Sequence, residues 1–124
     1  MLLREEDVQP KVTDVEQLKK QVRKMAASKV LAGSSADVGL DLAQMAGCRV
    51  RIAAGYGPPG KESAAVPYDR LIWILDGYAD IHGPGGQVTH ISQGESALLT
   101  GGTPYRLNFP QLTLYLCVEA AERP

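Results

Sequence analysis

The sequence predicts an all-β protein, an antiparallel barrel or sandwich, with one amphipathic α-helix before the strands. Three observations predict this class. Short apolar runs follow one another from about residue 48 to residue 119, Gly and Pro turns separate them, and no helical crossover interrupts them. Strands without crossovers must pair antiparallel. The 124-residue chain is long enough for one domain to bury its own core.

The overall composition argues against several kinds of partner. The 13 Lys and Arg residues nearly balance 14 Asp and Glu residues and form no basic run, so we expect no binding to nucleic acid or to a membrane surface. No segment approaches the ~20 apolar residues of a membrane span. Cys48 and Cys117 lack metal-type spacing and lie in or beside apolar runs. They indicate reduced, packed thiols in a cytoplasmic protein.

The N-terminal part of the chain divides into an arm, a helix and an unassigned stretch. Residues 1–12 are polar and contain Pro10, which predicts an arm without structure of its own. Residues 13–28 have apolar side chains at spacings of three and four, and Thr13 with Glu16 has the spacing of a capping box, so a helix packed on the barrel is predicted. Residues 29–124 are predicted to form the barrel. Within this range, residues 29–47 could be a loop, a strand or a helical turn.

Alternating apolar residues define the first and last strands. The run C-R-V-R-I-A places Cys48, Val50 and Ile52 on one face and two arginines on the other. Pro110 separates two predicted strands near the end of the chain, Y-R-L-N-F and L-T-L-Y-L-C-V-E. The second of these is apolar on both faces, which predicts a place in the middle of a sheet.

Two groups of residues have the spacing of known motifs. In the first, Gly57 is followed by Ser63, Ala65, Arg70 and Gly77; in the second, Gly94 is followed by Thr100, Gly102, Tyr105 and Phe109. This spacing resembles the two motifs of the cupin superfamily. The resemblance implies a cupin-type antiparallel β-barrel, or jelly roll, in a small single-domain bacterial protein.

The metal-ligand positions of those motifs are not retained. Ser63 and Ala65 replace the two His of the first motif, Arg70 replaces its Glu, and Tyr105 replaces the last His. Hydroxyl, methyl and guanidinium groups do not provide the imidazole, carboxylate or thiolate ligands of a transition metal. We therefore expect no metal and no other cofactor. A metal site elsewhere would require convergence of Glu62, Asp69, His82 and His90.

A narrower resemblance concerns the ethanolamine-utilisation type of small cupin. It is carried by Tyr68-Asp69 before an apolar strand that ends at Gly77, and by the stretch from Gly102 through Phe109-Pro110 to Ala120. The likeness covers about residues 50–120. It implies a role in carbon metabolism such as ethanolamine utilisation, and a homodimer.

The strongest candidate binding residue is Arg70. Arg70, Ile72 and Ile74 alternate along one strand and share a face, which the cupin register points into the barrel. A guanidinium suits carboxylate or phosphate. One hypothesis is that Arg70 binds a small anion together with Ser63, Tyr68 and Tyr105. The other is that Arg70 forms an internal ion pair with Glu62, Asp69 or Glu95.

Three functions follow from these alternatives. The leading interpretation is metal-free binding of a small anionic metabolite by an accessory or sensor protein. The second is an isomerase, lyase or cyclase in which Tyr105 and Tyr68 transfer protons while Arg70 stabilises an enolate or carboxylate. The third is a filled barrel that only docks a protein partner. Trp73 and Leu75 are expected to face outward, where the helix or a second subunit would cover them.

Overall fold

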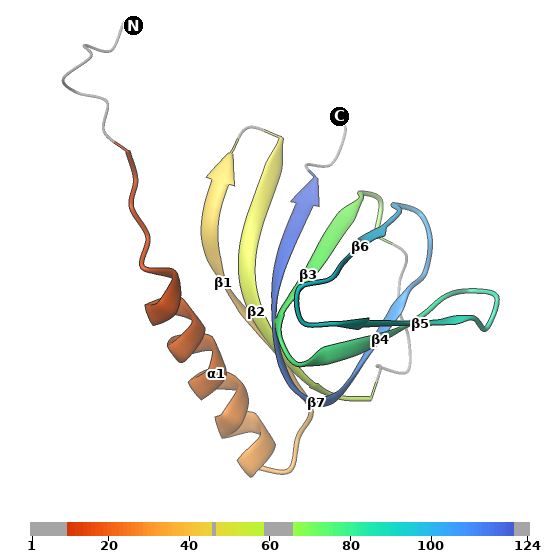
Figure 1. The fold of residues 1–124 in the computed structure, drawn as a ribbon, viewed down its shortest axis with the longest axis horizontal. Helices are drawn as coiled ribbons and strands as arrows, with labels where there is room; N and C mark the ends of the chain where they lie inside the picture. Colours follow the sequence, from red (N-terminus) through yellow and green to blue (C-terminus); the bar gives the residue numbers. More distant parts are fainter. Residues whose placement is uncertain (1–9, 46, 59–65, 121–124) are drawn as a thin grey trace, which may run out of the picture.

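The computed structural model describes residues 10–45, 47–58 and 66–120. One helix precedes seven antiparallel strands that form a curved, open sheet (Figure 1). The elements are α1 (Val15–Leu31), β1 (Ala36–Met45), β2 (Cys48–Gly57), β3 (Arg70–Asp76), β4 (Tyr78–His82), β5 (Val88–Ser92), β6 (Ser96–Leu99) and β7 (Arg106–Ala120). The predicted all-β class with one N-terminal helix is confirmed.

The strand order is β1-β2-β7-β3-β6, and β4 pairs with both β5 and β7. Strand β7 holds the two parts of the sheet together. Its first residues pair with β4, as in Asp80 opposite Asn108, and its later residues lie between β2 and β3, where Leu116 is opposite both Ile52 and Trp73. The predicted central position of this strand is confirmed.

Strand β7 continues through Pro110, where the sequence predicted a break between two strands. Gly57 pairs with Phe109 and Gly55 pairs with Thr113, so the β2–β7 register shifts at the proline. A proline is tolerated at such an irregularity because its missing N–H is not needed for the ladder. The predicted two strands are therefore one strand that passes from one part of the sheet to the other.

The helix begins and ends later than predicted. Asp14 is its N-cap, and the Asp14 carboxylate accepts a hydrogen bond of 3.1 Å from the backbone N–H of Gln17. Asp is a better cap than Thr13, which explains the shift. At the other end, Gly33 has φ +84°, and the N–H groups of Gly33 and Ser34 donate to the carbonyls of Val30 and Lys29. This glycine-dependent turn, and not Ser28, ends the helix.

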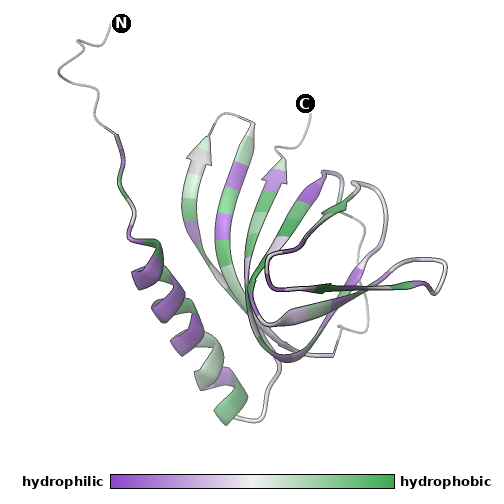
Figure 2. Cartoon of the chain, viewed as in Figure 1, coloured by the Kyte–Doolittle hydropathy of each residue, from purple (hydrophilic) through white to green (hydrophobic). Residues whose placement is uncertain are grey.

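Strand β1 lies in the stretch that the sequence left unassigned. Its apolar residues Val38, Leu40 and Leu42 pack toward α1, and the intervening positions Asp37, Gly39 and Asp41 lie on the opposite, concave face of the sheet. Figure 2 shows the polar positions alternating with apolar ones along the neighbouring strand β2. The period of two is the signal that could have identified β1 from its sequence.

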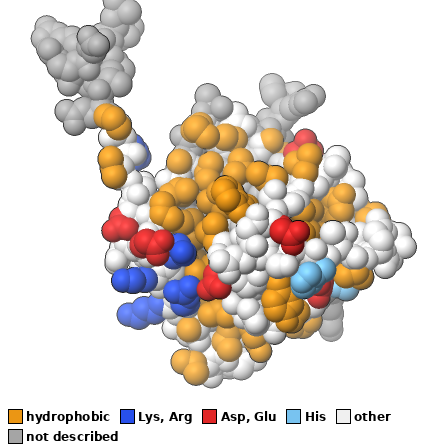
Figure 3. All heavy atoms as spheres, viewed as in Figure 1, with side chains coloured by type: hydrophobic (Ala, Val, Ile, Leu, Met, Phe, Trp, Pro, Cys, Tyr) orange, Lys and Arg blue, Asp and Glu red, His pale blue; other side chains and the backbone are white. Residues whose placement is uncertain are grey.

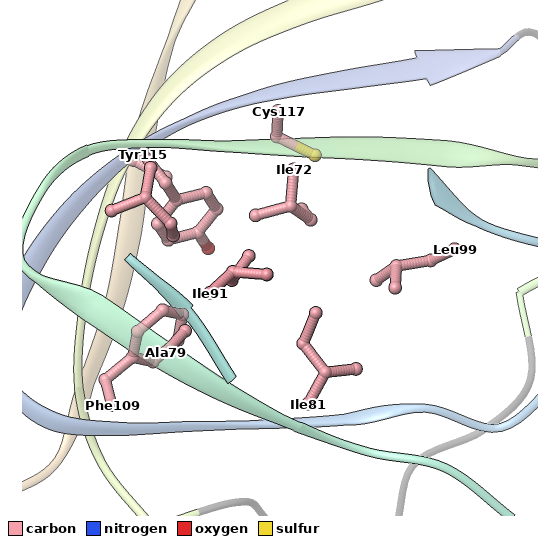
Figure 4. Packing of buried hydrophobic residues seen from close by; sticks show 10 residues of the cluster. Ile72, Ala79, Ile81, Ile91, Leu99, Phe109, Tyr115 and Cys117 are labelled. Carbon is pink, nitrogen blue, oxygen red and sulfur yellow. The ribbon is translucent and has the colours of Figure 1, made fainter. Parts of the chain in front are cut away.

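Two apolar clusters stabilise the fold on opposite sides of the sheet. The first lies inside the barrel and contains Ile72, Ala79, Ile81, Ile91, Leu99, Phe109, Tyr115 and Cys117 (Figure 4). The second lies between the sheet and α1 and includes Val22, Ala26, Ile52 and Leu114. Ile72 and Ile74 are 1% and 0% exposed within the first cluster, which confirms that alternate residues of β3 point inward.

The outer face of the sheet is covered by α1 only in part. Leu75 packs against the outer cluster, whereas Trp73 is 45% exposed and Leu98 is 62% exposed. Both predicted outward positions are thus found, and the helix covers one of them. Figure 3 shows apolar side chains gathered on this face beside α1. Within the described residues, no helix is long and apolar enough to cross a membrane.

Candidate functional site

A cavity of about 380 Å³ lies where four strands meet. It is lined by the beginnings of β1, β3 and β7, by the end of β2 and by residues beside them. The lining residues are Ser35, Ala36, Asp37, Tyr56, Gly57, Pro58, Arg70, Tyr105, Arg106, Leu107 and Phe109. The cavity therefore brings together segments that are far apart in the sequence, among them two arginines and two tyrosines.

Arg70 lines this cavity and has an unpaired guanidinium nitrogen. Strand β3 positions it at the end of the row that continues inward with Ile72 and Ile74. Its Nε is buried and has no hydrogen-bond partner among the described residues. Buried nitrogens of this kind are nearly always hydrogen-bonded in native proteins. The Nε of Arg51 is also buried and without a hydrogen-bond partner, but Arg51 has ion pairs with Asp41 and Glu119, whereas Arg70 has none among the described residues.

Two of the three internal partners proposed for Arg70 are engaged elsewhere. The Asp69 carboxylate accepts a hydrogen bond of 2.7 Å from the backbone N–H of Gly101. The Glu95 carboxylate accepts hydrogen bonds of 2.9 and 3.2 Å from the N–H and hydroxyl of Ser92, which lower the pKa of Glu95. Neither forms an ion pair with Arg70. Glu62 lies outside the described residues.

The other sequence-predicted site residues differ in whether they line this cavity. Tyr105 lines the cavity with Arg70, and it also lines a smaller cavity of about 230 Å³ beside β4 and β6. Tyr68 does not line the cavity at Arg70. Burial and the neighbouring Glu119 carboxylate raise the pKa of Tyr68, whereas Arg70 opposes this rise. Ser63 lies outside the described residues.

Asp37 and Arg106 are cavity residues that sequence reasoning missed. The hydroxyl of Tyr115 donates a hydrogen bond of 2.7 Å to Oδ1 of Asp37. Burial, followed by the Asp37 charge, raises the pKa of Tyr115 well above its ordinary value, so the phenol stays protonated and remains a donor. The Tyr115 ring stacks on Phe109, which lines the cavity, at a centroid distance of 5.3 Å. The Tyr115 phenol therefore holds the Asp37 carboxylate in place through this hydrogen bond.

The concave face next to this site carries further charges. Arg49 contacts Asp41 at 2.8 Å, and Arg51 contacts Glu119 at 3.6 Å. Register places Glu119 opposite both Arg49 and Arg70, so this charged row crosses β2, β7 and β3. The two arginines predicted on the non-core face of β2 thus point into the barrel. Arg49, Arg51 and Arg70 thus share the concave face with the three carboxylates of Asp37, Asp41 and Glu119.

Cys117 lies between these charges and the apolar core. Burial, followed by the Glu119 charge, raises the pKa of its thiol to about 12. The side chain is 5% exposed and packs in the inner cluster. A neutral buried thiol is a poor nucleophile, so the prediction that Cys117 packs as a small hydrophobe is consistent with its surroundings.

The described residues do not fit a metal ion. No three His, Cys, Asp or Glu side chains in this part of the chain are grouped so as to bind one. Nδ1 of His90 lies 2.8 Å from Oδ1 of Asp80, on the β4–β5 hairpin, and His82 is opposite Val88 in the register. Asp69 is engaged by Gly101. The convergence that a metal site would have required is therefore absent among the donors that the structure describes.

Comparison with known proteins identifies the fold. No protein-family model matches the chain, and no curated protein matches it. An EutQ protein from Clostridium difficile superposes with a TM-score of 0.63 at 18% sequence identity, over 70% of this chain and 69% of that chain. A cupin superfamily protein from Desulfitobacterium hafniense gives 0.60 at 14% identity, over 70% and 79% of the two chains.

A third structure agrees with these two. An RmlC-like cupin protein from Desulfovibrio desulfuricans has a TM-score of 0.55 at 16% identity, over 68% of this chain and 81% of that chain. Likeness at such low identity shows the fold and not the activity. The chain thus has the cupin fold predicted from its glycine spacing, and its structural neighbours are cupin superfamily proteins that include EutQ.

Proposed function

We propose that this protein binds a small anionic metabolite, a carboxylate or a phosphate, in the cavity at Arg70 and without a metal. The observation that carries the proposal is the position of Arg70, which lines an open cavity and forms no ion pair among the described residues, while its buried Nε has no hydrogen-bond partner there. An anion bound to this guanidinium would supply a counter-charge that the described carboxylates do not supply.

The surroundings of Arg70 support the same ligand class. Arg106 adds a second guanidinium to the cavity lining, and Tyr105 adds a hydroxyl. The volume of about 380 Å³ suits a small molecule. An accessory or sensor role in carbon metabolism such as ethanolamine utilisation is part of the proposal, because a putative ethanolamine utilization protein Q from Salmonella typhimurium has a similar fold, with a TM-score of 0.60 at 14% identity. The two free cysteines agree with a cytoplasmic protein.

Thermal denaturation in the presence of small carboxylates and phosphates tests the proposal. A ligand that binds only the folded state raises the unfolding midpoint. We expect at least one anion at millimolar concentration to raise the midpoint of the native protein and to leave that of Arg70→Ala unchanged. If no anion stabilises the native protein, or if Arg70→Ala responds equally, the proposal is wrong.

A catalytic role is the second candidate function, favoured by the position of Tyr105 beside Arg70 in one cavity. A phenol can act as general acid or base, and a guanidinium can stabilise an enolate or carboxylate. Tyr68 does not line this cavity, so Tyr105 is the better candidate for proton transfer. Turnover of a substrate that is lost in Tyr105→Phe with folding intact would support catalysis, and an unchanged rate would exclude this tyrosine.

We also propose that the protein is a homodimer that buries the exposed part of the outer sheet face. Trp73 and Leu98 lie there on the neighbouring strands β3 and β6, at 45% and 62% exposure. Exposed apolar patches of this kind commonly mark association surfaces. The molecular mass in solution tests this proposal.

A further inference from the structure

We propose that the ligand of this cavity is a hydroxylated monoanion, whose anionic group binds the arginines and whose hydroxyl donates a hydrogen bond to Asp37. This inference rests on the proposed function and adds the chemical class of the ligand. It depends on one arrangement: a cavity that holds two guanidinium groups and one anchored carboxylate.

The opposite charges in the cavity do not neutralise each other directly. Arg70, Arg106 and Asp37 all line it, yet within the described residues neither arginine forms an ion pair with Asp37. The cationic groups and the carboxylate are therefore separated. A molecule that occupies the space between them can contact both, with an acceptor at one end and a donor at the other.

The carboxylate of Asp37 is held ready to accept a hydrogen bond. Tyr115 donates to its Oδ1 at 2.7 Å, and Tyr115 is itself 5% exposed and stacked on Phe109. Oδ2 of Asp37 has no hydrogen-bond partner in the described part of the chain, so this atom can accept from a ligand. A carboxylate fixed by a buried phenol loses little freedom when it binds.

The charge balance favours a hydroxyl over an ammonium as the donor. Two arginines and one aspartate give the ionisable lining groups a formal charge of +1. A monoanion with a hydroxyl compensates this charge, whereas a zwitterion would leave the second arginine without a counter-charge. The cavity of about 380 Å³ has space for a ligand in which a short carbon chain connects the two groups.

Matched ligand sets separate this inference from the proposed function. One set is 3-hydroxypropionate, propionate and β-alanine, and the other is methyl 2-hydroxyethyl, methyl ethyl and methyl 2-aminoethyl phosphate, diesters whose phosphate carries one negative charge. Within each set only the distal substituent changes, from a hydroxyl group to a hydrogen atom to an ammonium group. Dissociation constants come from chemical-shift titration of the isotope-labelled native protein, a method suited to millimolar affinity.

We expect the hydroxylated member of at least one set to bind about tenfold more tightly than its deoxy partner, the effect of one hydrogen bond to a charged acceptor. Asp37→Ala should remove this preference. Ala presents neither a donor nor an acceptor to the ligand hydroxyl, and the loss of the carboxylate makes the cavity more positive. The deoxy anion should therefore bind this variant as tightly as the native protein, or more tightly.

Each outcome has one meaning. Equal binding of the hydroxylated and deoxy members to native protein would overturn this inference and leave anion binding intact. Tighter binding of the ammonium member, or a hydroxyl preference that persists in Asp37→Ala, would also overturn it. If no member of either set binds the native protein, while other anions do, the ligand class is wrong; if no anion binds at all, the proposed function is wrong with it.

Discussion

The phenol oxygen of Tyr115 lies 2.7 Å from Oδ1 of Asp37, a residue 78 positions away in the sequence. The bond joins the middle of the central strand β7 to the beginning of the outermost strand β1. It also connects the buried aromatic core to the lining of the cavity, because Phe109 packs on Tyr115. The contact thus links the buried core to the candidate site.

Removal of that hydroxyl should lower stability without opening the core. Tyr115→Phe keeps the stacked ring but leaves Asp37 without its donor, and we expect the free energy of unfolding to fall by about 1–3 kcal/mol. Urea unfolding monitored by circular dichroism measures the change. Tyr56→Phe, at a tyrosine that is 36% exposed, is the control and should change stability by less than about 0.5 kcal/mol. Equal losses in the two variants would show that the bond contributes nothing.

Stability should also fall at alkaline pH because of Cys117. Burial raises the pKa of its thiol from the ordinary 9.0 to about 12 in the folded protein. The unfolded chain therefore loses this proton at a lower pH than the folded chain does. The stability is fully present below about pH 9 and is lost as the pH rises toward about 12.

Urea unfolding at a series of pH values measures this effect. Cys117→Ala removes the thiol, so its free energy of unfolding should fall less steeply between these pH values than that of the native protein. Cys48→Ala is the control, since Cys48 is only half-buried. Parallel pH profiles for native protein and Cys117→Ala would contradict the prediction.

Anion binding should distinguish the arginines of the site from other arginines. Arg70→Lys keeps the charge but replaces the planar fork by a single ammonium, so we expect weaker binding than in the native protein and stronger binding than in Arg70→Ala. Arg106→Ala should lower affinity as well. Arg23 pairs with Asp76 on the helix side of the sheet at 3.3 Å. Arg23→Ala is therefore the control, and a loss of affinity in it equal to that in Arg70→Ala would argue against a local site.

The contact between β2 and Phe109 should not tolerate a side chain at Gly55. A Cβ at this position would lie 2.5 Å from the Phe109 ring, which is buried and stacked on Tyr115. We expect Gly55→Ala to lower the free energy of unfolding by about 1–3 kcal/mol through overpacking. Gly86→Ala, on the hairpin between β4 and β5, has free space for a Cβ but a φ of +83°, so it reports the cost of backbone strain alone.

The dimer proposal predicts a change of mass on mutation of the outer face. Size-exclusion chromatography with light scattering should give twice the chain mass of 13.3 kDa for the native protein. Trp73→Glu places a charge in the exposed apolar patch and should give a monomer with an unchanged circular dichroism spectrum. Met25→Glu is the control, at a helix position with 39% exposure. A native protein that is monomeric at micromolar concentration would exclude the dimer.

The sequence by itself determined the fold class. The period of two in β2, β3 and β7 and the spacing of Gly57, Gly77 and Gly94 predicted an antiparallel barrel of cupin type. They also placed Ile72 and Ile74 in the core. These predictions succeeded because strand alternation and turn chemistry are local properties of the chain.

Only the tertiary structure decided which polar residues share the cavity. Arg70 and Tyr105 line it together and Tyr68 does not, and Asp37 enters it from a strand that the sequence left unassigned. The continuity of β7 through Pro110 could not be predicted from the sequence either, because it depends on a shift in the register between β7 and β2. Such features arise when strands that are distant in the sequence pair with each other. The register of this pairing, and the side chains it brings into contact, cannot be predicted from the local sequence alone.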